Sequence, residues 1–337
     1  MSGFSFVSVG RATTVTFASF LLLAAIAAPE TGAAPMDTSP LQTSTPIKLF
    51  YDEQLVREGF PSPALRVTVG EITAWLLVDT GASVHTLASW FVRDAGIPSS
   101  ASTITASDSA GHEVTMRVAR DIPLKIDGAP WLMIPEAAIA DFPPDFQRLR
   151  IAGLLSPQLL AGAGTVSVLD LRAPSLQVTS DPGAMDRVEA QNAKSITVCR
   201  VAASPLRNLL FGLGASVAGV NVALTLDTGA SSTILDMSRP AAKGLRDLQP
   251  DGFQTGASGV REPILRSAPM GVDFGAGERT MPLRTGVPQH GCGADGLIGM
   301  DAVRNCVLAM SDRALALRCD PPPGAARELH DSTRPGN

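Results

Sequence analysis

The sequence is poor in aromatic residues and in charge of either sign. Of the 337 residues, 5% are aromatic and 18% are charged, and Tyr51 is the only tyrosine. The net charge is −5, the pI is near 5.4, and no run of Lys or Arg occurs, so nothing favours nucleic acid as a partner. Hydrophobic residues make up 45%, which indicates a globular protein. A chain of 337 residues is long enough for two domains.

Cysteine does not occur in the first half of the chain. The four cysteines are Cys199, Cys292, Cys306 and Cys319. They lack the close pairs of a zinc site, and we expect neither a metal centre nor a cofactor. An even number fits two disulfides in an oxidising compartment, with three possible connectivities. The stretch "CVLAMSDRALALRC" is typical of a hairpin turning at Asp312-Arg313, which favours Cys306–Cys319 and leaves Cys199 for Cys292.

No apolar run is long enough to span a membrane comfortably. Arg11 precedes an apolar stretch at about 15–28, and small residues and prolines follow, which is the order of a secretory signal. No cysteine follows that would carry a lipid anchor. We therefore expect a secreted or periplasmic protein with no stable membrane association after cleavage. An uncleaved membrane anchor is the alternative.

One pentapeptide, Asp-Thr-Gly-Ala-Ser, occurs twice, beginning at Asp79 and at Asp227. Before each copy stand two β-branched, apolar runs split by a turn, "ALRVTVG" and "ITAWLLVDT" before the first, "LLFGLG" and "GVNVALTLDT" before the second. After each copy come a polar turn, an apolar-Gly segment ("AGLLS", "DGLIGMD") and a strand-like hairpin. The repeat predicts two lobes of similar, β-rich design.

The expected organisation follows from this repeat and from composition. The segments are 1–34, signal peptide and start of a linker; 35–60, linker or short propeptide; 61–180, N-terminal lobe; 181–195, interlobe connection; 196–320, C-terminal lobe; and 321–337, disordered tail.

An aspartate at the end of a buried apolar strand needs a chemical reason. A buried carboxylate loses hydration, which only hydrogen bonds or a chemical role can justify. The next residues supply a hydroxyl, a glycine that lets backbone amides approach, and two small side chains. A single Asp-Thr-Gly could be an ordinary turn, but two matched copies point to one shared site.

The two motifs, "VDTGAS" and "LDTGAS", each after an apolar strand and before an apolar-Gly element, resemble those of aspartic peptidases of the pepsin and retropepsin clan. The resemblance implies an all-β, bilobal acid-protease fold, with two related β-barrel-like lobes and the active site between them. It assigns catalysis to Asp79 and Asp227, which would share one proton and activate a water. The chemistry of such a carboxyl pair requires no metal ion. The resemblance also implies that Thr80 and Thr228 brace the two turns, while Gly81 and Gly229 permit their close approach.

The chain departs from pepsins in several ways that make it more similar to retropepsins. Ala82 and Ala230 stand where pepsins usually carry Ser or Thr, each lobe is short, and the flap tyrosine is missing. Ser156 stands where the second copy has Gly299.

In the clan, a hairpin after each motif folds over the substrate, and two polar turns fit that place. The candidate substrate-binding residues are Ser109, Ala110, Gly111, Ser258 and Gly259. Ordinary surface hairpins are the alternative. His85 has no counterpart in the second copy and is expected to be local packing, whereas His112 beside its turn is expected to be solvated.

The predicted function is that of an aspartic endopeptidase, a monomer whose partner is a polypeptide substrate. One alternative keeps the fold as a binding protein whose dyad has lapsed, although both aspartates are intact. Another assigns the repeated Asp-x-Gly to phosphate loops of an actin or sugar-kinase type fold. That fold needs long amphipathic helices, and the chain has few stretches of helical period.

Overall fold

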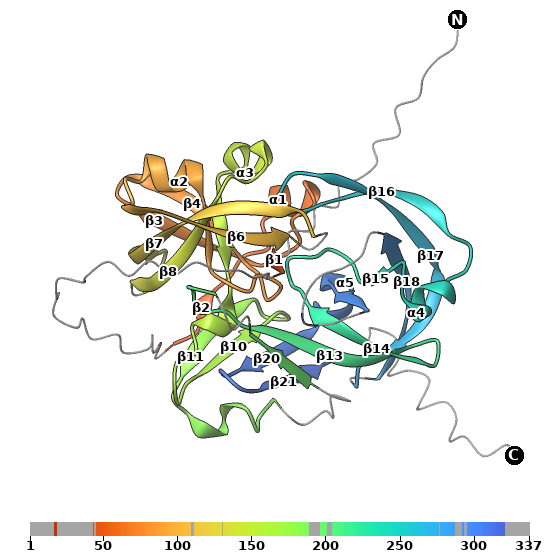
Figure 1. Cartoon of the computed structure of the whole chain (residues 1–337). Helices are drawn as coiled ribbons and strands as arrows, with labels where there is room; N and C mark the ends of the chain where they lie inside the picture. The colour runs from red at the N-terminus through yellow and green to blue at the C-terminus, as the bar shows by residue number, and fades with distance from the viewer. Residues whose placement is uncertain are drawn as a thin grey trace, which may run out of the picture.

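The chain forms two β-barrels joined by a third sheet (Figure 1). The computed structural model describes residues 17–18, 43, 45–108, 111–129, 131–188, 196–200, 204–275, 277–286, 292 and 295–320. The predicted signal peptide lies outside the described residues except for Phe17–Ala18, and the predicted tail at 321–337 lies wholly outside them.

The N-terminal barrel has six strands, closed because β7 pairs with both β3 and β8. In order around the barrel they are β3 (Ala64–Val69), β4 (Ile72–Val78), β9 (Ile151–Leu155), β5 (Thr86–Ala88), β8 (Leu132–Ala140) and β7 (Glu113–Ile126). β6 (Ser99–Asp108) extends the sheet beside β7, and the two-residue β1 (Phe17–Ala18) pairs with the end of β6.

The C-terminal barrel repeats this order. Its strands are β13 (Leu210–Val217), β14 (Val220–Leu226), β19 (Gly296–Ile298), β15 (Ile234–Asp236), β18 (Glu278–Gly286) and β17 (Arg261–Asp273), closed by pairing of β13 with β17. β16 (Gln249–Thr255) lies outside β17, and β12 (Ile196–Cys199) lies outside β13. The predicted all-β architecture of two related barrel-like lobes is confirmed.

A five-stranded sheet joins the lobes, in the order β2 (Ile47–Lys48), β11 (Ser175–Thr179), β10 (Val166–Asp170), β20 (Cys306–Met310) and β21 (Leu315–Cys319). The halves meet where β10 pairs antiparallel with β20. Residues of the segment expected to be a linker or propeptide take part, because β2 adds to the edge of β11.

The helices are short, and in the described ranges none is long and apolar enough to cross a membrane. They are α1 (Glu53–Arg57), α2 (Ser89–Asp94), α3 (Pro144–Arg148), α4 (Pro240–Lys243) and α5 (Met300–Val303), with 3₁₀ turns η1 (Pro157–Leu159) and η2 (Pro182–Ala184).

A glycine at the same place in each barrel allows two strands to cross closely. Gly153 in β9 and Gly296 in β19 both have φ 147°, a value that side-chain-bearing residues rarely adopt. A Cβ at Gly153 would overlap the carbonyl oxygen of Thr86, and one at Gly296 would overlap that of Ile234. These are the glycines of the "AGLL" and "DGLI" segments in the repeat.

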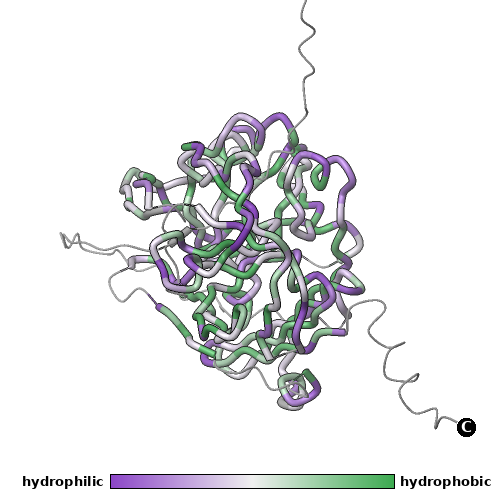
Figure 2. Tube along the Cα trace, turned by 90° about the vertical axis from the view of Figure 1, so that its right-hand side faces the viewer, coloured by the Kyte–Doolittle hydropathy of each residue, from purple (hydrophilic) through white to green (hydrophobic). Residues whose placement is uncertain are grey.

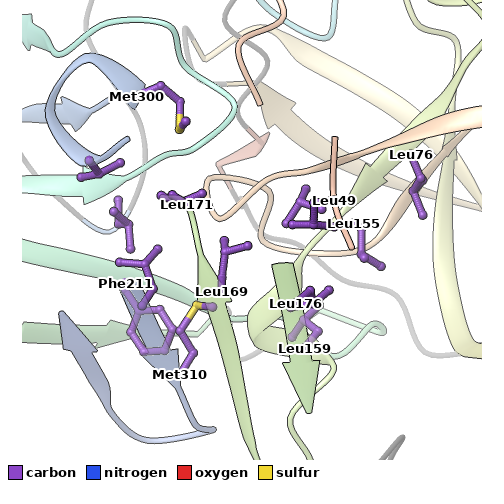
Figure 3. Close-up of a cluster of buried hydrophobic side chains, with 14 of the residues drawn as sticks. Leu49, Leu76, Leu155, Leu159, Leu169, Leu171, Leu176, Phe211, Met300 and Met310 are labelled. Carbon is purple, nitrogen blue, oxygen red and sulfur yellow. The ribbon is translucent and has the colours of Figure 1, made fainter. Parts of the chain in front are cut away.

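One hydrophobic core runs through both barrels and the joining sheet. Figure 3 shows part of it, where Leu169 and Met310 of the joining sheet lie near Phe211 of β13, and Leu176 lies near Leu159. Figure 2 shows hydrophilic segments in many of the outer turns of the trace and hydrophobic segments through much of its interior.

Two disulfides fasten the C-terminal half. Cys306 and Cys319 are bonded and face each other across the β20–β21 hairpin, and Cys199 is bonded to Cys292. This is the connectivity that the hairpin pattern favours.

Candidate functional site

The two repeated motifs form turns that meet between the lobes. Asp79 follows β4 and Asp227 follows β14, and both side chains are fully buried. Each turn begins with the same backbone bond, because the amide of Asp79 donates to Leu155 O at 2.9 Å and that of Asp227 donates to Ile298 O at 3.0 Å. The aspartates thus leave parallel strand pairs at equivalent points of the two barrels.

Each turn has a glycine where the opposite carboxylate lies. A Cβ on Gly229 would lie 2.6 Å from Cγ of Asp79, and a Cβ on Gly81 would overlap the Asp227 carboxyl group in the same way. Any larger residue at either position would push the opposing aspartate away. The two turns therefore approach each other closely at these glycines.

The two threonines hold the turns together through a reciprocal set of hydrogen bonds. Thr80 N donates to Thr228 Oγ1 at 3.0 Å, and Thr228 N donates to Thr80 Oγ1 at 3.0 Å. The hydroxyls in turn donate to Leu226 O at 3.1 Å and to Val78 O at 2.9 Å. Both threonines are buried, so each turn is fixed by the strand end of the opposite lobe.

The carboxylates themselves accept backbone hydrogen bonds. Gly81 N donates to Asp79 Oδ1 at 2.8 Å, while Gly229 N and Ala230 N donate to Asp227 Oδ1 at 2.8 and 3.0 Å. Burial, followed by the nearby Asp227 carboxyl, raises the pKa of Asp79 well above its ordinary value. Oδ2 of Asp79 is buried and makes no hydrogen bond to the described residues. The pair can therefore hold one proton between two carboxyl groups, an arrangement suited to general acid–base chemistry on a water.

The two hairpins that carry the candidate flaps contact each other. Ser258 Oγ, after β16, donates to Oδ2 of the buried Asp108, at the end of β6, at 2.6 Å. His112 Nε2 lies 3.1 Å from Glu262 Oε1 of β17, so His112 is not simply solvated as the sequence suggested. Ala257 is fully buried in a cluster made largely of N-terminal lobe residues.

The candidate flap residues divide between described and undescribed parts of the chain. Gly111 and Gly259 have φ 86° and 78°, as their turns require. A Cβ at Gly259 would lie 3.7 Å from Cγ of Pro143 in the other lobe. Ser109 and Ala110 lie outside the described residues.

Several buried polar residues around the turns were not singled out from sequence. Ser62 and Gln158 donate to backbone carbonyls of the two motifs, and the Asp301 carboxylate accepts from Thr233. Ser156, noted only as a mismatch, donates from Oγ to Ala82 O at 2.7 Å. The two copies of the repeat carry different residues at these positions, so the repeat did not mark them.

Residues 65–158 match the model of a family described as aspartyl protease. The matched segment includes the first motif and most of the N-terminal barrel, and it supports an aspartic protease family for this part of the chain. The second motif lies beyond it. A search of the curated proteins found no significant match.

Proposed function

We propose that the protein is an aspartic endopeptidase, in which Asp79 and Asp227 together activate the water that hydrolyses a peptide bond. The observation that carries this proposal is the meeting of two fully buried carboxylates, each opposite a glycine and each on a turn braced by a threonine. A buried carboxyl pair is costly to keep without a chemical use. The aspartyl protease match over residues 65–158 agrees with it.

The proposed reaction uses the two carboxyls in complementary roles. Because burial and the neighbouring carboxyl raise the pKa of Asp79, we infer that the pair retains one proton, shared between the two carboxyls. The ionised carboxylate of the pair accepts a proton from the water as the water oxygen attacks the scissile carbonyl, and the protonated carboxyl donates its proton to the carbonyl oxygen. Collapse of the tetrahedral intermediate returns protons to the leaving amine and to the dyad, with no covalent enzyme intermediate.

We further propose that the two contacting hairpins bind the polypeptide substrate and that the protein works outside the cytoplasm. Gly111, Ser258 and Gly259 lie in the turns of these hairpins. The two disulfides support an oxidising compartment. Protein isolated from its native compartment should begin after the predicted signal and contain no free thiol. Four reactive thiols would contradict this localisation.

The main test replaces each aspartate singly. Asp79→Asn and Asp227→Asn keep size and shape but prevent the pair from sharing a proton, so each should lower cleavage of an unbiased peptide library by at least about 1000-fold. The double variant should be hardly worse than either, because the two residues act as one unit. Thermal unfolding checks that each variant is folded. Activity should be bell-shaped in pH on the acidic side of neutral and blocked by pepstatin-type inhibitors.

The same experiment distinguishes an active peptidase from a peptide-binding protein that has lost its catalytic activity. If the wild-type protein binds peptides but cleaves none across the acidic range, the peptidase proposal fails. If either folded Asn variant keeps more than a few per cent of wild-type cleavage, the two motifs do not form one catalytic site.

A further inference from the structure

The amides of Gly81 and Gly229 donate to the two aspartates. The carbonyl oxygen of each of these peptide units also accepts a hydrogen bond. In the Thr80–Gly81 peptide, Gly81 N donates to Asp79 Oδ1 at 2.8 Å. In the Thr228–Gly229 peptide, Gly229 N donates to Asp227 Oδ1 at 2.8 Å. A trans peptide is planar, so its C=O points opposite to its N–H. Whatever holds the carbonyl of Thr80 or Thr228 therefore fixes the amide that faces the carboxylate.

The carbonyl of Thr80 is held by Gln158. This residue lies in η1, its side chain is fully buried, and its Nε2 donates to Thr80 O at 3.2 Å. The same Nε2 also lies 3.0 Å from Ala82 O and 3.0 Å from Leu209 O of the following half of the chain. Gln158 thus fixes peptide units on both sides of Gly81.

The carbonyl of Thr228 is held by a different residue from the opposite lobe. Ser62, two residues before β3, is 2% exposed, and its Oγ donates to Thr228 O at 2.9 Å. Equivalent residues of the two motifs, such as Thr80 and Thr228, are 148 positions apart in the sequence.

The repeat does not supply the same donors in both lobes. By the strand ladders, the counterpart of Gln158 is Asp301, which accepts from Thr233, and the counterpart of Ser62 is Leu210, which has no side-chain donor. Both donors therefore come from the N-terminal lobe: Gln158 supports the peptide unit of its own motif, and Ser62 supports that of the opposite motif.

We propose that Gln158 and Ser62 are positioning residues of the dyad, Gln158 for Asp79 and Ser62 for Asp227. Neither touches a carboxylate. Each acts through one peptide unit, by fixing its plane and by polarising its N–H through the bond to its C=O. The proposal rests on the proposed peptidase function for its kinetic consequences, but the effect on the carboxylates does not require turnover.

The kinetic test uses substitutions of matched shape. Ser62→Ala and Gln158→Met each remove the donor, and we expect kcat to fall about 10- to 100-fold with KM changed less than about twofold, as for other residues that orient a reacting group indirectly. Ser62→Thr keeps the hydroxyl and should restore kcat to within about threefold of wild type. Ser167→Ala is the control, because Ser167 is fully buried in β10 and its hydroxyl has no hydrogen-bond partner among the described residues.

A second measurement follows the carboxyls directly, by ¹³C NMR titration of labelled aspartates in the folded protein. A weaker N–H bond favours the neutral carboxyl, so Gln158→Met and Ser62→Ala should shift the dyad titration to higher pH, and Ser167→Ala should not. Gln158→Leu, which is apolar and has no donor, serves if Gln158→Met does not fold.

The outcomes separate the two proposals. A titration shift in a protein that cleaves no peptide supports positioning and overturns the peptidase function. Unchanged kcat and an unchanged titration in an active protein, with only a lower Tm, would overturn positioning and leave the function standing.

Discussion

The two lobes use the same backbone around their aspartates but satisfy it with different side chains. In the C-terminal lobe, Met300 N donates to Ala230 O at 2.9 Å. The equivalent position in the N-terminal lobe is Pro157, which has no N–H. There, Ala82 O accepts instead from the Ser156 hydroxyl at 2.7 Å and from the Gln158 amide at 3.0 Å.

A second difference between the lobes concerns the backbone amides of Ser156 and Gly299, which have different acceptors. Ser156 N donates to Nδ1 of the buried His85 at 3.1 Å, whereas Gly299 N donates to Thr233 Oγ1 at 3.3 Å. Thr233 also donates to Asp301 Oδ1 at 2.8 Å, and burial raises the pKa of that carboxyl. Gly299 has no room for a side chain, since a Cβ would lie 2.5 Å from the carbonyl carbon of Ser232.

This comparison shows which features the duplicated fold requires. The aspartates, threonines and glycines of the turns are alike because the turns face each other and must fit as a pair. The residues behind the turns differ because a buried backbone group needs a partner, and the chemical identity of that partner is open.

Among the substitutions that compare the two lobes, the largest effect is expected from filling the space between the turns. Gly81→Ala and Gly229→Ala each place a methyl group on the opposing carboxyl, so each should lower kcat at least about 100-fold in peptide cleavage assays. Gly244→Ala is the control, because the nearest atom to its Cβ is Ala241 O at 3.5 Å. Equal losses at the two glycines support a symmetric pair. If Gly229→Ala keeps a near-normal kcat, the two glycines are not equivalent.

Removing the hydroxyl of Thr80 or of Thr228 should lower the free energy of unfolding, by a similar amount at the two sites. Thr80→Val and Thr228→Val each leave a buried amide and a buried carbonyl without partners, at a cost of about 2–4 kcal/mol in unfolding free energy. Thr→Ser at either site should recover most of it. Denaturant unfolding measures both, and a much smaller cost at one site would mean that the brace is one-sided.

His85 should make the N-terminal lobe lose stability on acidification in a way that its counterpart Thr233, which does not titrate, cannot. Burial, followed by the Arg207 charge, lowers the pKa of His85 from 6.5 to about 3. Between these values the unfolded chain binds a proton that the folded protein does not, so stability falls as pH drops from about 6.5 towards 3, by up to roughly 4 kcal/mol.

His85→Thr places the residue of the C-terminal lobe at this position. We expect a lower Tm at neutral pH, because the smaller side chain leaves space, but a shallower loss of Tm on acidification. An unchanged acid slope would assign the dependence to other groups.

The smallest effect tests whether Pro157 explains the extra side-chain donors. Ser156→Gly, the residue of the second lobe, should cost about 1–2 kcal/mol, because Ala82 O keeps only the Gln158 bond. Adding Pro157→Met restores a backbone N–H and should recover part of that loss in a double-mutant cycle. No recovery would mean that the backbone at position 157 cannot reach Ala82 O.

Much of the fold could be predicted from local patterns. The strand pairs on either side of Gly70 and Ala218–Gly219, the hairpin between Cys306 and Cys319, and the glycines of β9 and β19 all follow from apolar runs, turn residues and the repeat. The proposal of a dyad followed from the duplicated motif and its resemblance to a known family. The edge strand β2 and helix α1 were missed, because elements of two and five residues are too short to show a strand or helix period.

The sequence by itself determined the two β-rich halves, the residues of the paired turns and the two aspartates, because these depend on period, turn chemistry and repetition along the chain. Only the tertiary structure decided which partners meet across it. The contacts of Ser62 with Thr228, Asp108 with Ser258 and His112 with Glu262 join residues 150 or more positions apart. A single polar residue leaves no periodic signal, and its partner is fixed only when the two barrels close and bury both groups.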